Sequence, residues 1–83
     1  MVGFEICAEV TVRVFLIKNR SVRRPWIESS TGCWVSTGDD PDPEVAMRMA
    51  TEEMVDMVMH RKKLTFEEAY MLVTACGDLT ICQ

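Results

Sequence analysis

The sequence predicts an α+β fold in which two helices cover a mostly antiparallel sheet. Residues 4–17 alternate between apolar and other side chains, residues 43–61 repeat apolar side chains at helical spacing, and residues 64–82 contain a helix start, a helix stop and a short alternating run. With 83 residues, the chain is expected to form one domain, residues 1–83. A chain of this size buries only about 60% of the surface that its unfolded form exposes. We therefore expect a marginal core that a partner subunit completes.

The longest predicted strand covers residues 4–17. Its apolar face consists of Phe4, Ile6, Ala8, Val10, Val12, Val14 and Leu16. A strand of this length needs neighbours on both sides, and the rest of the chain offers few of them. The prediction therefore includes an unpaired edge with free N–H and C=O groups, which favours pairing with another chain.

Two shorter strands follow, near residues 25–28 and 33–37. Pro25 opens the first of them, which suits an edge strand because a proline cannot donate to a sheet ladder. The polar residues 29–32 form the turn between the two strands. An acidic loop then ends at Asp42, a predicted N-cap, with Pro43 at the first helical position.

The first helix is predicted over about residues 43–61. Its apolar stripe is Met47, Ala50, Met54, Val55 and Val58, and the opposite, polar side carries Arg48, Glu52, Glu53 and Asp56. The methionines of this helix suit either a plastic binding groove or an adaptable core and interface. The second interpretation is favoured, because the same side chains are needed to cover the sheet.

The second helix is predicted over residues 66–76, followed by a strand over residues 78–82. Thr65 and Glu68 match a capping box, in which each side chain bonds the free backbone N–H of the other residue. Gly77 stands where a helix commonly ends in a left-handed residue.

Composition restricts the classes of function. A net charge of −4 argues against nucleic-acid binding, and the basic clusters at residues 18–20, 23–24 and 60–63 are interpreted as solvated loop and helix-end charges. No run approaches the roughly 18 apolar residues of a membrane helix. The four cysteines could form two disulfides, but without a secretory signal or a C-x-x-C pair they indicate a reduced, cytoplasmic protein.

Few side chains suggest chemistry. His60 lies in a basic helix end, where a charge that complements the helix dipole is favoured over a general base or a metal ligand. The Thr37-Gly38-Asp39-Asp40 stretch could line a polar pocket or bind a cation, although an ordinary acidic turn is favoured. Asp78 either caps a strand or points into a pocket between helix and sheet. The chain contains no complete active site.

Five blocks of the sequence point to a family. In order they are residues 9–18 with Glu9-Val10-Thr11-Val12-Arg13-Val14, Pro25-Trp26-Ile27-Glu28, Thr37-Gly38-Asp39-Asp40, Ala46-Met47-Arg48-Met49-Ala50, and Glu67-Glu68-Ala69-Tyr70-Met71-Leu72 with Gly77-Asp78-Leu79. Their order and spacing resemble the C-terminal part of acetamidase/formamidase proteins. The resemblance covers nearly the whole chain.

The resemblance implies a hydrolase that converts small linear amides to a carboxylate and ammonia, with a divalent metal in the full-length family. The Gly-Asp-x-His-Ala-x-Gln-Gly-Asp-Gly-Glu pattern of that family would precede Val2 and is absent from these residues. No catalytic or metal-binding residue is therefore assigned, and Thr37, Asp39 and Asp78 are expected only to border the substrate site. We expect an amidase fragment that lacks activity by itself: either the activity requires the N-terminal half in trans, or it is lost.

The alternative is a non-catalytic binding or structural module that retains the fold. In both cases we expect a homodimer or a higher oligomer, formed through the unpaired strand edge by sheet extension or by exchange of strands and helices.

Overall fold

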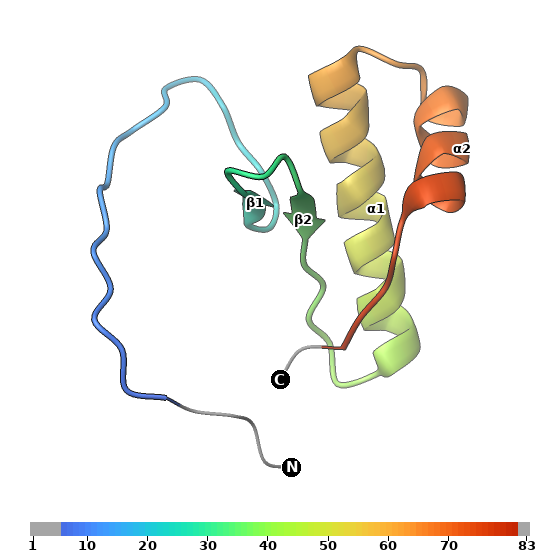
Figure 1. Cartoon of the computed structure of the whole chain (residues 1–83). Helices are drawn as coiled ribbons and strands as arrows, with labels where there is room; N and C mark the ends of the chain where they lie inside the picture. Colours follow the sequence, from blue (N-terminus) through green and yellow to red (C-terminus); the bar gives the residue numbers. More distant parts are fainter. Residues whose placement is uncertain (1–5, 82–83) are drawn as a thin grey trace.

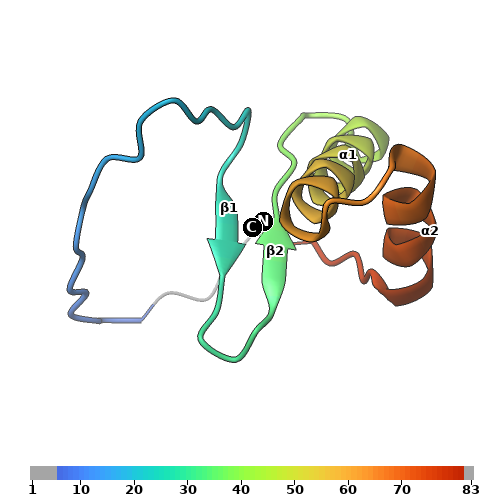
Figure 2. The ribbon, with the colours of Figure 1, turned by 90° about the horizontal axis from the view of Figure 1, so that it is seen from above.

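The computed structural model describes residues 6–81 and shows a small α+β arrangement. Its elements are β1 (Trp26–Glu28), β2 (Trp34–Ser36), α1 (Pro43–Lys62) and α2 (Phe66–Cys76). α1 stands between the β-hairpin and α2, as Figures 1 and 2 show. The predicted α+β class and both helices are confirmed. The arrangement differs from the prediction, because α1 contacts the sheet while α2 packs mainly on α1.

The two strands pair antiparallel, with Ile27 opposite Val35. The predicted strands near residues 25–28 and 33–37 are confirmed and are one or two residues shorter. Trp26 and Trp34 lie on the hairpin face that points to α1, where the hydroxyl of Ser36 donates to the carbonyl of Ala50 at 2.7 Å. Ile27 and Val35 lie on the other face and are exposed. Only one face of the hairpin is therefore covered.

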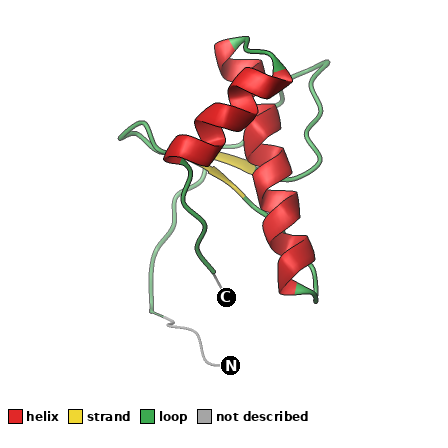
Figure 3. Ribbon diagram, turned by 90° about the vertical axis from the view of Figure 1, so that its right-hand side faces the viewer, coloured by secondary structure: helices red, strands yellow, loops and turns green. Residues whose placement is uncertain are grey.

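α1 begins and ends with recognisable caps. The side chain of Asp42 accepts the N–H of Glu44 at 2.9 Å, and Pro43 occupies the first turn, as predicted. Lys63 ends the helix in the left-handed conformation, with φ 53°. The buried apolar residues of the described chain are Val55, Met57 and Val58 from α1 and Ala69 from α2. Val55, Val58 and Ala69 form one cluster where the two helices pack against each other (Figure 3).

The ends of α2 differ in detail from the prediction. Thr65 Oγ1 accepts the N–H of Glu68 at 3.3 Å, but the Glu68 carboxylate accepts the Thr65 hydroxyl at 3.1 Å and not its backbone N–H. Gly77 is extended, with φ −74°, so the expected left-handed residue is wrong. A Cβ on Gly77 would lie 2.5 Å from the carbonyl oxygen of Val73. Close approach to the helix, and not handedness, requires glycine here.

The predicted long strand at 4–17 and the short strand at 78–82 are not formed by the described residues 6–17 and 78–81; Phe4, Glu5 and Cys82 lie outside the described chain. Residues 6–17 run along the side of the molecule away from the helices (Figure 1). A strand satisfies its backbone N–H and C=O groups through a neighbouring strand. Within residues 6–81, no segment pairs with residues 6–17. These residues therefore have the alternating sequence of a strand but no backbone pairing with a neighbouring strand.

Gly38 tests how closely β2 is joined to α1. A Cβ at this position would lie 2.1 Å from the carbonyl oxygen of Ala46 and 2.7 Å from the N of Ala50. We expect Gly38→Ala to lower the free energy of unfolding by about 3 kcal/mol, because backbone must move to relieve the overlap. Urea unfolding followed by circular dichroism measures the effect, with Ser30→Ala in the exposed turn as the control. Equal stability of the two variants would contradict the close approach.

Candidate functional site

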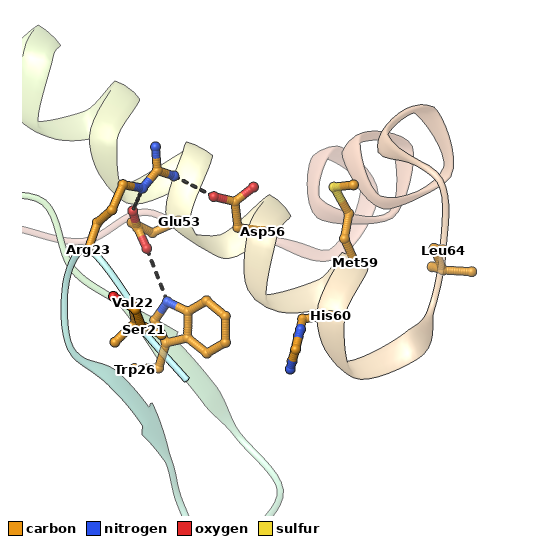
Figure 4. A pocket seen from close by; sticks show the side chains of 9 residues that line it. All are labelled: Ser21, Val22, Arg23, Trp26, Glu53, Asp56, Met59, His60 and Leu64. Carbon is orange, nitrogen blue, oxygen red and sulfur yellow. Dashed lines mark hydrogen bonds and ion pairs between the residues drawn. The ribbon is translucent and has the colours of Figure 1, made fainter. Parts of the chain in front are cut away.

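An open cleft of about 440 Å³ lies between the start of the hairpin and the second half of α1 (Figure 4). Its walls combine apolar, aromatic and charged side chains from the two sides. The lining residues are Ser21, Val22, Arg23, Trp26, Glu53, Asp56, Met59, His60 and Leu64. This cleft is the candidate functional site.

Glu53 is the buried charged residue of the cleft, with only 4% of its surface exposed. Its Oε1 lies 2.7 Å from Nε of Arg23, and its Oε2 accepts the indole N–H of Trp26 at 3.1 Å. Arg23 also bonds the carboxylate of Asp56. A buried carboxylate is costly unless it is paired and hydrogen-bonded. Both oxygens of Glu53 meet that condition, so the network joins residues 23–26 to the middle of α1.

The ring of Trp26 forms an aromatic wall of the cleft. The guanidinium of Arg20 lies 5.6 Å from its centroid, in cation–π geometry. The ring of His60 lies 6.1 Å away at an interplanar angle of 59°. His60 thus contributes to the wall of the cleft as well as to the basic end of α1. The cleft presents an aromatic and cationic rim over paired carboxylates.

The donor set does not fit a divalent metal. Among residues 6–81, no group of three or more His, Cys, Asp and Glu side chains is arranged to hold a metal ion. Glu53 and Asp56 are paired with Arg23, and Asp39 Oδ1 lies 2.8 Å from Nη1 of Arg24. Arginine already occupies these three carboxylates, so they do not fit the divalent metal that the amidase resemblance implies.

The predicted border residues occupy two places. Thr37 is half-buried and Asp39 is exposed, and both lie in the connection from β2 to α1. Asp78 is exposed and follows α2. No hydrogen bond or ion pair within residues 6–81 joins Asp78 to Thr37 or Asp39. Thr37 and Asp39 are therefore close to each other because they are neighbours in the sequence, and neither they nor Asp78 line the cleft.

Sequence reasoning missed the residues that build the cleft. Glu53 was expected on the polar side of the helix and is buried, because the hairpin docks on that side of α1. Arg23 was expected to be a solvated loop charge, yet it pairs with two carboxylates of α1. The sequence signal was weak, because the residues near Arg23 and Trp26 do not indicate that their partner is Glu53, thirty residues after Arg23.

Neither helix in the described part of the chain combines the length and apolar character needed to cross a bilayer. Comparison with known proteins found no family model, no curated protein and no solved structure that matches this chain. The residue blocks described above and the site geometry are therefore the basis for assigning a function.

The Arg23 network can be tested by removing the arginine. Arg23→Ala leaves the Glu53 carboxylate, with 5% side-chain exposure, without its cationic partner, and we expect a loss of about 3 kcal/mol in the free energy of unfolding. The matched control is Arg48→Ala, which breaks an exposed pair with Glu44 at 3.6 Å and should cost less than about 0.5 kcal/mol. Urea unfolding followed by tryptophan fluorescence compares the two. A similar small loss for both variants would contradict a structural role for the network.

Proposed function

We propose that this chain is an acetamidase/formamidase-type unit, the C-terminal portion of a hydrolase that acts on the C–N bond of small linear amides. The observation that carries the proposal is the set of five sequence blocks in family order. Three of the later blocks fall on defined parts of the fold: residues 37–40 on the connection to α1, residues 46–50 on α1, and residues 67–72 on α2. The elements that these blocks occupy suit a scaffold that supports a site.

The role of this unit is to support catalysis by other residues. The cleft carboxylates of Glu53 and Asp56 are paired with Arg23, Asp39 is paired with Arg24, and the ring of His60 packs beside Trp26. A general base must reach the proton that it removes, and a nucleophile must reach its base. These residues provide no such pair, so the N-terminal half of the amidase supplies the metal and the base in trans. Thr37, Asp39 and Asp78 contribute polar groups at the border of the substrate site.

A second candidate is a non-catalytic oligomeric module that has kept the fold. The observation that favours it is the uncovered apolar segment at residues 6–17, which a binding or structural role would use directly. A cytoplasmic location suits both candidates. It is supported by Cys7, Cys33 and Cys76, which are free and exposed thiols, as expected in a reducing compartment.

The first prediction from this proposal concerns the chain alone. We expect no ammonia release from formamide or acetamide, with or without added zinc or calcium, because no described side chains form a base and metal set. An enzyme-coupled ammonia assay measures it, with an intact acetamidase as the positive control. Metal-dependent turnover by the isolated chain would contradict both the scaffold role and the non-catalytic module.

The second prediction concerns reconstitution. Mixing the chain with the N-terminal half of an acetamidase/formamidase should restore ammonia release, and Asp39→Asn should lower kcat/KM about tenfold by removing a charge at the site border. Glu67→Gln, at an exposed position in the first turn of α2, is the control and should leave kcat/KM unchanged. If activity is restored and Asp39→Asn leaves kcat/KM unchanged, Asp39 does not border the substrate site. No activity with any half would favour the non-catalytic module.

A further inference from the structure

The described fold leaves more surface exposed than a folded monomer of its size. The chain has an accessible surface of 7661 Å², against about 5,000 Å² for a compact protein of the same mass. Its radius of gyration is 14.7 Å, against about 12 Å for a compact chain of this length. The excess, about 2,600 Å², exceeds the roughly 800 Å² that each partner buries in a standard interface. The surface is sufficient for an obligate partner.

Residues 6–17 contribute the longest uncovered run. The exposed fraction of their large apolar side chains reaches 87% for Ile6 and Val14, with 72% for Val12 and 75% for Phe15. The segment leads into Arg23 and Arg24. Arg23 pairs with Glu53 and Asp56 (Figure 4), and Arg24 pairs with Asp39. From these two residues the segment extends away from α1 and α2 (Figure 1). Its apolar side chains are therefore exposed to another chain.

The sequence of this segment is complementary to itself in the antiparallel direction. When two copies pair about a two-fold axis at Thr11, residues at equal distances from Thr11 face each other. Glu9 of each copy then faces Arg13 of the other, and Val10 faces Val12. Directly opposed residues of an antiparallel pair lie on the same face of the sheet. The six apolar residues at even positions of both copies, 6, 8, 10, 12, 14 and 16, therefore fall on one face, and both ion pairs fall on the other face together with Cys7, Thr11 and Phe15.

We propose that two copies of this chain pair residues 6–16 as an antiparallel ribbon centred on Thr11. The ribbon completes the ladder that residues 6–17 lack, and a two-fold axis makes the contact self-complementary. The uncovered hairpin faces of the two copies, with Ile27 and Val35, are apolar in the same way as the even-numbered face of the ribbon. A second copy is the partner because opposite charges stand at equal distances on either side of Thr11. The proposal is independent of the amidase assignment.

Charge exchange tests the register. Glu9→Arg or Arg13→Glu alone places like charges opposite each other twice, and each should weaken the dimer on the order of 30-fold in sedimentation equilibrium. The double variant, Glu9→Arg with Arg13→Glu, should restore the wild-type dissociation constant. An equimolar mixture of the two single variants should form the heterodimer, because its two opposed pairs are both attractive. Circular dichroism confirms that each variant keeps its helices.

A disulfide at the axis provides an independent measurement. In a chain whose four native cysteines are replaced by serine, Thr11→Cys places two thiols opposite each other and should give a cross-linked dimer under mild oxidation. The control keeps Cys7 alone, because the two Cys7 residues of this ribbon stand about 25 Å apart. A folded monomer overturns the proposal. A dimer whose dissociation constant is unchanged by the charge exchange, and which does not cross-link at residue 11, also overturns the proposal. So does a chain that does not pair with itself and pairs only with a longer polypeptide carrying residues upstream of residue 1.

Discussion

The pairing of the buried Glu53 carboxylate with Arg23 and Trp26 is the interaction on which the rest of the fold depends. It joins the start of the hairpin to the middle of α1, and the hydroxyl of Ser36, which stands opposite Trp26 in the strand pairing, bonds the carbonyl of Ala50 about one turn earlier in α1. With so small a core, apolar packing alone leaves the hairpin weakly positioned. The hydrogen bonds and ion pairs of the network fix the position of the hairpin on α1. Because the buried Glu53 carboxylate would be costly without its partners, the network favours the one docking geometry that supplies them.

Arg23 and Arg24 connect the Glu53 network to two other regions, the connection from β2 to α1 and the exposed segment at residues 6–17. Arg24 pairs with Asp39, on the connection that carries two of the proposed border residues, and Arg23 pairs with α1. The same two residues form the base from which residues 6–17 leave the body. The position of a possible substrate-site border and the direction of the exposed segment therefore depend on adjacent side chains. A change at either arginine affects both regions together.

Local chemistry explains which parts of the structure were predictable. Asp42 with Pro43 and Thr65 with Glu68 mark helix starts through contacts within a few residues, and the short hairpin follows from its turn. The strand predicted at residues 4–17 is not formed by residues 6–17, because a ladder depends on a neighbouring strand and residues 6–81 provide none. Glu53 was misplaced for a related reason: its burial is decided by a hairpin about thirty residues earlier. The same limit applies to the site, since Thr37 and Asp39 are joined by the chain while the position of Asp78 depends on how α2 docks.

The uncovered segment also affects the fate of the newly made protein. Between Val10 and Ile17, one charged residue, Arg13, interrupts a run of β-branched and large apolar side chains. Such runs, when exposed, form intermolecular β-structure, and nearby charges act as gatekeepers against it. A chain in which this run is uncovered is therefore open to aggregation and to quality-control proteases. In the proposed dimer, the fraction of chains protected from both fates would thus rise with the concentration of the protein itself.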